Sequence, residues 1–223
     1  MKDKFLKILS TIMLFVLSIN IVYAVPEKPP GGGNGGNASS ISYKGSNTIT
    51  SDTTNSNETY SSTNNGENAL LVSGGTSTLN NVTITKSGSE SSENSDFYGT
   101  NAAVLVHNNA TLNLVGGTIT TNGSHANAIF AYNTGVINAS NIEVTTTGNN
   151  SGGIMVTGGG TLTATNLDIE TSGNSSASIR SDRGGGTLTV NGGTYKTNGV
   201  GSPAIYSTAD ITVNDATLNS NAS

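Results

Sequence analysis

The chain has 223 residues, of which 10% are charged and 5% are aromatic, with 29 glycines and no cysteine. The lack of cysteine excludes disulfide bonds, Cys metal sites and thiol chemistry. The formal net charge is −5, and because an acidic surface does not attract nucleic acid, we expect no nucleic-acid partner.

Residues 1–24 have the pattern of a secretory signal peptide. Three lysines give a basic start, an apolar stretch runs over 8–22, and Val22 and Ala24 stand at the −3 and −1 positions of a cleavage site. We predict cleavage after Ala24, with an uncleaved membrane anchor as the alternative. No later stretch has the ~18 apolar residues of a membrane helix, so we expect no membrane insertion after cleavage.

Residues 25–40, VPEKPPGGGNGGNASS, form a predicted linker that proline stiffens and glycine loosens. The next segment, 41–66, is strand-like but lacks the full repeat seen later. A solenoid must cover its first open turn, because free strand edges and an open core aggregate. We therefore predict that 41–66 is an N-terminal cap and that a β-helix occupies 67–223.

The β-helix is predicted from a repeat of about 25 residues. Ile129 matches Ile154, and the same spacing recurs in three apolar columns. The columns are Val104, Ile129, Ile154, Ile179 and Ile205; Leu112, Ile137, Leu162, Leu188 and Ile211; and Ile84, Ile119, Val144, Ile169, Tyr195 and Leu218. These columns predict about six turns. The pattern is still running at Ser223, so we expect the chain to be part of a longer protein.

One turn is longer than the others. The step from Ile84 to Ile119 is 35 residues, and we place the insertion in GSESSENSDFYG, residues 88–99.

Within each turn the apolar residues alternate with polar ones, which favours strands over helices. Three short strands per turn, with Gly, Asn or Asp between them, predict a parallel β-helix, and crossover rules make it right-handed. One corner column contains only residues that adopt positive φ readily. Its members are Asn81, Gly116, Asn141, Asn166, Gly192 and Asp215. Stacked Asn side chains in this column are expected to pair from turn to turn.

Several stretches carry a family resemblance, among them NNGENALLVSGG, SGGIMVTGGGTL, SIRSDRGGGTLTVNGGTY and SPAIYSTADITV. With them the chain resembles secreted adhesin-like parallel β-helix proteins of anaerobic, mostly Gram-positive bacteria. It is more loosely similar to autotransporter passenger domains and pectate-lyase-type repeats. The resemblance implies a secreted or cell-surface protein, and it transfers no catalytic residue to this chain.

Few residues of the chain could take part in catalysis or bind a metal ion. Glu143 and Asp168 hold matching outward positions on adjacent turns, with Glu170 and Lys196 nearby. Polysaccharide-cleaving β-helices use clustered carboxylates, often with Ca²⁺, so a weak Ca²⁺ site is one interpretation. We favour the other, a solvated face on which Glu170 and Lys196 pair across strands.

We assign structural roles to the remaining polar candidates. His107 and His125 lie near corners, with no carboxylate or second histidine spaced to join them. In the run 180–183, RSDR, an Asp–Arg pair is expected to hold a corner. We therefore expect no catalytic residue, no metal site and no cofactor.

One outward column is unusual for a surface of Ser, Thr and Asn. Its members are Leu71, Leu105, Phe130, Met155, Arg180 and Tyr206. Large exposed apolar groups mark contact surfaces, so we predict a binding stripe at Leu105, Phe130, Met155, Arg180 and Tyr206. The alternative is that the column packs under the cap or under the insertion at 97–98.

The sequence thus predicts a non-enzymatic adhesin-like binding or display module. Its partner would be a host or matrix glycan or protein, or a second copy of the chain. The alternatives are a polysaccharide lyase or hydrolase of the β-helix type and a purely structural surface spacer.

Overall fold

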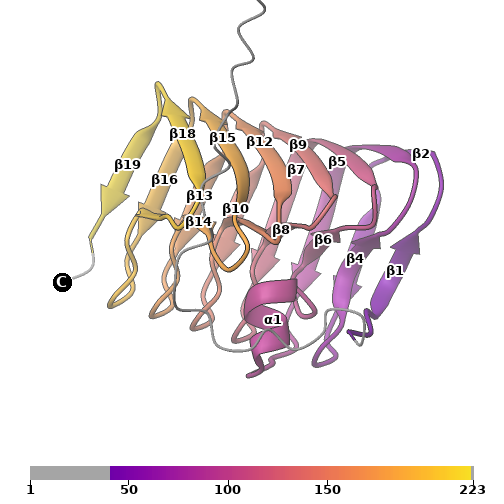
Figure 1. The fold of residues 1–223 in the computed structure, drawn as a ribbon, viewed down its shortest axis with the longest axis horizontal. Helices are drawn as coiled ribbons and strands as arrows, with labels where there is room; N and C mark the ends of the chain where they lie inside the picture. The colour runs from indigo at the N-terminus through magenta and orange to yellow at the C-terminus, as the bar shows by residue number, and fades with distance from the viewer. Residues whose placement is uncertain (1–40, 222–223) are drawn as a thin grey trace, which may run out of the picture. The chain divides into compact units, whose positions relative to one another are not determined.

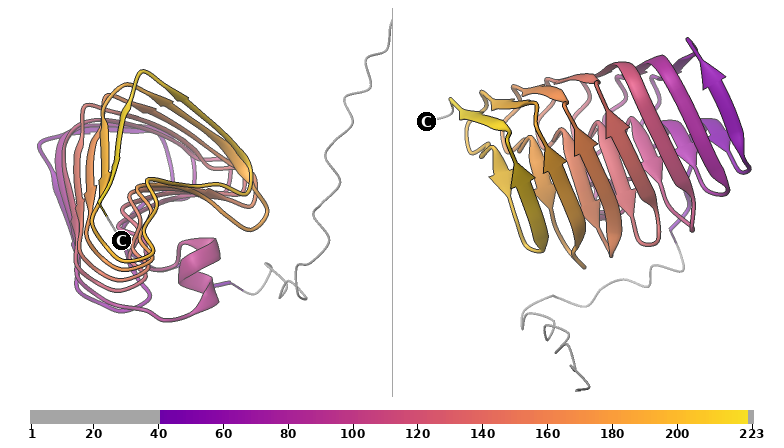
Figure 2. Two further views of the ribbon diagram at one scale, coloured as in Figure 1. Left: turned by 90° about the vertical axis from the view of Figure 1, so that its left-hand side faces the viewer. Right: turned by 90° about the horizontal axis from the view of Figure 1, so that it is seen from above.

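A computed structural model describes residues 41–221; the predicted signal peptide (1–24), the predicted linker (25–40) and residues 222–223 lie outside the described residues. The described chain is a parallel β-solenoid, in which each strand pairs with its counterpart one turn away (Figures 1 and 2). Within these residues, no helix is both long enough and apolar enough to span a membrane.

The first sheet takes one strand from every turn. It consists of β1 (Gly45–Ile49), β4 (Asn68–Val72), β6 (Val104–Val106), β8 (Ile129–Tyr132), β11 (Ile154–Thr157), β14 (Ile179–Ser181) and β17 (Ile205–Tyr206). Seven strands in one row mean seven turns.

The second sheet forms the rest of the coil. It consists of β2 (Thr53–Ser56), β3 (Thr59–Ser62), β5 (Thr76–Lys86), β7 (Thr111–Thr121), β9 (Val136–Ser140), β10 (Glu143–Thr146), β12 (Gly160–Thr165), β13 (Asp168–Thr171), β15 (Gly186–Asn191), β16 (Thr194–Thr197), β18 (Asp210–Asn214) and β19 (Thr217–Ser220). Five turns have the three predicted strands. In the second and third turns, two strands merge into the long β5 and β7.

The structure has seven turns, whereas six were predicted, and the additional turn is the first one. Residues 45–62 pair in parallel register with β4 and β5 and so form a complete first turn. Sequence reasoning missed it because two of its inward positions are polar where later turns are apolar, although Ile49 and Tyr60 pack in the core. Asn47 stands against Leu70, and Asn55 stands against Leu79. Polar inward residues suit an end turn that meets water on one side.

The predicted register is confirmed in all three apolar columns. Ile154 lies between Ile129 and Ile179, and Leu162 lies between Ile137 and Leu188. The third column runs through Ile84, Ile119, Val144, Ile169, Tyr195 and Leu218. Nearly all of these side chains are buried in one continuous core inside the coil. Burial of apolar surface is the main driving force for folding, so this core defines the fold.

The predicted corner column is also confirmed. Asn81, Gly116, Asn141, Asn166, Gly192 and Asp215 all have positive φ, between 51° and 68°. Asn166 Nδ2 donates to Asn141 Oδ1 at 2.9 Å, and an equivalent bond of 2.7 Å joins Asn81 to Asn57 in the first turns. Both pairs are exposed, so the corners depend mainly on residues that tolerate the left-handed conformation.

A second ladder explains how so polar a chain fills its interior. Thr171 Oγ1 donates to the Ser176 carbonyl oxygen at 2.6 Å, and Ser176 Oγ accepts from the Ser151 backbone N–H at 2.9 Å. The same contacts recur one turn on, where Thr197 Oγ1 donates to the Ser202 carbonyl oxygen. These side chains are fully or almost fully buried. Because the hydroxyls of Thr146, Thr171 and Thr197 are paired, these polar residues avoid the cost of unsatisfied buried groups.

Lys86 breaks this pattern. It faces inward where Thr121 stands one turn later, and it is only 1% exposed. Its ammonium donates to the carbonyl oxygens of Asn64 and Gly88, at 2.7 and 2.8 Å. Burial lowers the pKa of Lys86 from 10.5 to about 8, against an opposing effect of Glu67 and Glu90.

The low pKa of Lys86 predicts a stability that rises with pH. Between pH 8 and pH 10 the unfolded chain keeps the Lys86 proton that the folded chain loses, so the free energy of unfolding increases. We expect a gain of about 1–2 kcal/mol over this window, measured by urea denaturation. In Lys86→Met the gain should disappear. An equal gain in both proteins would show that another group causes it. The window ends at pH 10 because burial raises the pKa of Tyr195, which reverses the sign above that point.

Candidate functional site

The outward column of the first sheet, here called the outer column, is the candidate site. Its members are aligned on successive turns in the predicted register: Leu71, Leu105, Phe130, Met155, Arg180 and Tyr206. Leu105, Phe130 and Met155 are 0% exposed, whereas Tyr206 is 45% exposed. The expectation of an exposed stripe is therefore wrong for Leu105, Phe130 and Met155. A binding role for Arg180 and Tyr206 stays a prediction.

The insertion covers the column, as the alternative interpretation expected. Its helix α1 (Glu93–Tyr98) begins after the N-cap Ser92 and ends at Gly99, whose φ is +73°. Figure 2 shows α1 outside the coil, against one side of the stacked turns. Leu71, Ala102, Leu105, Phe130 and Met155 form a second apolar cluster there, separate from the core inside the coil.

Gly99 lets the backbone of the insertion lie directly on this cluster. A Cβ at this position would come within 2.8 Å of Leu105 Cδ1 and 3.0 Å of Phe130 Cγ. A larger residue would therefore lift the insertion from the column, besides adopting an unfavourable positive φ.

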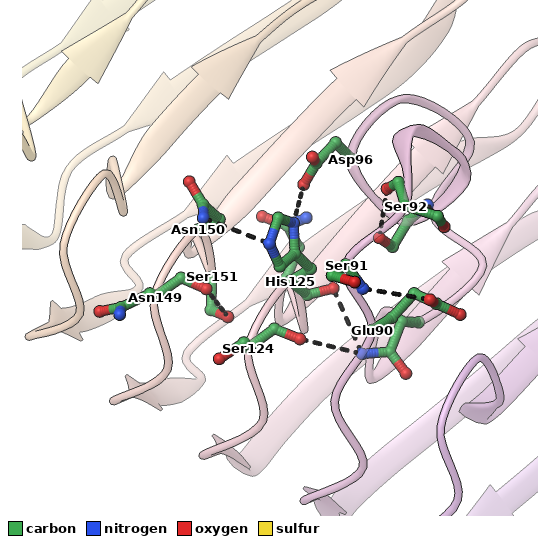
Figure 3. Close-up of polar contacts among 12 residues, drawn as sticks. Glu90, Ser91, Ser92, Asp96, Ser124, His125, Asn149, Asn150 and Ser151 are labelled. Carbon is green, nitrogen blue, oxygen red and sulfur yellow. Dashed lines mark hydrogen bonds and ion pairs between the residues drawn. The ribbon is translucent and has the colours of Figure 1, made fainter.

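A histidine on the next turn holds the outer side of α1 (Figure 3). His125 Nδ1 donates to Asp96 Oδ1 at 2.6 Å, and Asn150 Nδ2 donates to His125 Nε2 at 3.3 Å. Because the Asp96 carboxylate can only accept, the contact places a proton on Nδ1. The expectation that no carboxylate joins His125 is therefore wrong, because Asp96 reaches His125 when the insertion folds back over the turns.

Further contacts hold α1 at the other side. Thr157 Oγ1 donates to the Phe97 carbonyl oxygen at 2.7 Å. The Arg183 guanidinium lies 3.8 Å from the centre of the Phe97 ring and pairs with Glu93 at 3.1 Å. Through these contacts, an insertion between the second and third turns reaches residues of the fourth, fifth and sixth turns.

Aromatic rings close the N-terminal end of the column. Tyr43 stacks at 4.4 Å on His107 and lies 6.4 Å from Tyr132, which meets Tyr98 edge-on at 5.5 Å. Burial raises the pKa of Tyr43 and lowers the pKa of His107. Both shifts favour the neutral forms, which suits packing rather than acid–base catalysis.

The column ends at Arg180 and Tyr206, on the sixth and seventh turns of the described chain. Beyond Met155, a pocket of about 240 Å³, here called the end pocket, is lined by Asn150, Ser175, Ala177, Arg180, Gly201, Pro203 and Tyr206. The Arg180 guanidinium lies 5.6 Å from the centre of the Tyr206 ring. Arg180 Nη2 donates to Asp182 Oδ2 at 2.6 Å, which confirms the predicted Asp–Arg pair. The end pocket thus offers a half-exposed ring, a fixed guanidinium, and hydroxyl and amide groups.

The acidic residues of the second sheet do not converge. Glu143 and Asp168 are neighbours in register, as predicted, and Lys196 pairs with Glu170 at 3.0 Å. The hydrogen bond from Lys196 is the main cause that lowers the pKa of Glu170. Over residues 41–221, no three His, Asp or Glu side chains come together in a way that could hold a metal ion.

Comparisons with known proteins identify no family for this chain. Neither the models of protein families, nor the curated proteins, nor the solved structures contain a match to this chain. The chain is a parallel β-solenoid. Its likeness to adhesin-like proteins remains an expectation from the sequence.

Proposed function

We propose that this β-solenoid is a secreted or cell-surface, non-enzymatic binding module of the adhesin type, which contacts its partner at the end pocket. The observation that carries the proposal is the change along the outer column. Met155 is fully buried, whereas Tyr206, two turns further, is 45% exposed. Past Met155 the column continues with Arg180 and Tyr206, which place a guanidinium and an aromatic ring in one pocket.

The chemistry of the end pocket supports binding. Aromatic rings and arginine are enriched among the residues that dominate binding energies. The Tyr206 ring can stack on a sugar or an apolar side chain, and the fixed Arg180 guanidinium adds a planar set of donors. Bonding to Asp182 holds that guanidinium in place before a partner arrives, which lowers the entropic cost of binding.

The arrangement of carboxylates supports a binding role over hydrolysis or lyase chemistry. Asp182 is engaged by Arg180, and Asp96 by His125. Glu143 and Asp168 lie side by side on an open strand face. A glycosidase needs two free carboxyl groups on either side of the scissile bond.

Replacement of Tyr206 with Ala tests the proposal. In a screen of glycans and matrix proteins, we expect the parent chain to bind at least one ligand and Tyr206→Ala to lose at least about tenfold in affinity, the size of a hot-spot contact. Val115→Ala is the matched control, because Val115 is 40% exposed on β7, outside the end pocket. A parent chain that binds nothing would favour the structural spacer. Equal losses in both variants would place the contact elsewhere.

A further inference from the structure

The covered part of the outer column and the end pocket belong to one surface. From the second turn on, the same register position carries Leu71, Leu105, Phe130, Met155, Arg180 and Tyr206, and Thr48 holds it in the first turn. The insertion lies against Leu105 and Phe130. Past Met155 the column continues with Arg180, whose side chain is 15% exposed, and Tyr206, which is 45% exposed. The occupant of the covered part therefore shows which chemistry the surface accepts.

That occupant is acidic and aromatic. The first turn of α1 carries Glu93 and Asp96, and its last turn has no basic residue. Phe97 and Tyr98 follow them directly. The solenoid meets these groups with complementary ones: Arg183 contacts Glu93 and the Phe97 ring, and His125 contacts Asp96. The solenoid surface therefore complements the insertion in charge and in aromatic contacts.

The cover is also structurally independent of the coil. The apolar cluster beneath α1 lies on the outer face of the first sheet, separate from the core inside the turns. Gly88 aligns with Gly123. Ser89 and Glu90 align with Ser124 and His125, and Asn101 aligns with Ala126. Residues 91–100 are thus the ten extra residues of the long turn, and the repeat closes without them.

We propose that α1 is a displaceable cover and that the outer column binds an acidic polypeptide segment with aromatic residues in its place. The inference rests on the proposed function, because it assigns the class of partner and the regulation of the same surface. The partner segment would enter at the end pocket and displace α1 from Phe130 and Met155. The cover would thus act as an intramolecular competitor.

Competition from α1 predicts that an external segment binds the full chain weakly. A tethered segment acts at an effective concentration of roughly millimolar. An external segment of similar intrinsic affinity therefore binds weakly while the cover is in place. Removal of the cover should raise the apparent affinity without any change at the end pocket.

The test compares the full chain with a full chain that lacks only residues 91–100, which joins Glu90 to Asn101. The probe is a fluorescent synthetic peptide, GSESSENSDFYG, the sequence of residues 88–99. We expect the shortened chain to bind this peptide at least about tenfold more tightly than the parent does. The same peptide with both aromatic residues replaced by serine is the control and should not bind. Equal weak binding by parent and shortened chain would overturn the proposal.

A second variant covers the case in which the shortened chain does not fold. Glu93→Gln with Asp96→Asn keeps the insertion but removes its charges opposite Arg183 and His125. This variant should bind the peptide more tightly than the parent does, and the absence of any gain would again count against the proposal. Uncharged oligosaccharides are the third probe. If they bind the uncovered column and the peptide does not, the polypeptide assignment is wrong. Tyr206→Ala tests the end pocket separately, so failure of one proposal can be told from failure of the other.

Discussion

Ile154→Asp is expected to unfold the middle of the solenoid. Ile154 is 0% exposed and lies between Ile129 and Ile179 in the core. The substitution buries a carboxylate that has no partner, which costs several kcal/mol, and we expect a loss of at least about 3 kcal/mol in the free energy of unfolding.

Thermal and urea denaturation measure this loss, and Thr165→Asp is the control. Thr165 is an exposed residue on β12 of the same turn, so the same new charge should change the stability by about 0.5 kcal/mol or less. Similar melting of both variants would contradict the assigned register.

Phe130→Ala is expected to have the second largest effect. Phe130 is fully buried between the first sheet and the insertion. Truncation of a buried Phe costs about 3–5 kcal/mol. We expect about 3 kcal/mol, because a short insertion can settle onto the smaller side chain.

The matched variant for Phe130→Ala is Tyr206→Ala in the same column. Tyr206 is 45% exposed, so its loss should change the melting temperature little. A Phe130→Ala variant that melts like the parent would show that the cover contributes no packing energy. Hydrogen exchange adds a local measurement, because the loss at Phe130 should appear first in the amides of α1.

The register of the solenoid could be predicted from the sequence because it depends on the alternation of apolar residues within each strand and on one repeat length. Ile129, Ile154 and Ile179 recur at a fixed spacing, and a buried face allows only one register. The positions of the corners could be predicted for a similar reason. Few residue types adopt positive φ at low cost, so the column through Asn141 and Asn166 was readable from residue type alone.

The first turn and Lys86 were not readable in this way. Asn47 and Asn55 interrupt the apolar pattern at the end of the coil, so residues 45–62 resembled a cap. The inward position of Lys86 could not be predicted from residue type, because lysine is almost never buried. It faces inward because two carbonyl oxygens, of Asn64 and Gly88, take the place of water around its ammonium.

The sequence by itself determined which apolar residues face inward from the second turn on, where the corners lie and that the second turn carries an insertion. These features depend on local alternation and on one repeated spacing. Only the tertiary structure decided where the insertion goes. Asp96 meets His125 across 29 residues, and Thr157 meets the Phe97 carbonyl across 60. Such contacts follow no period, since they arise from the burial of one particular apolar cluster. For this reason Phe130 is buried and Tyr206 is exposed, although both hold the same position in the repeat.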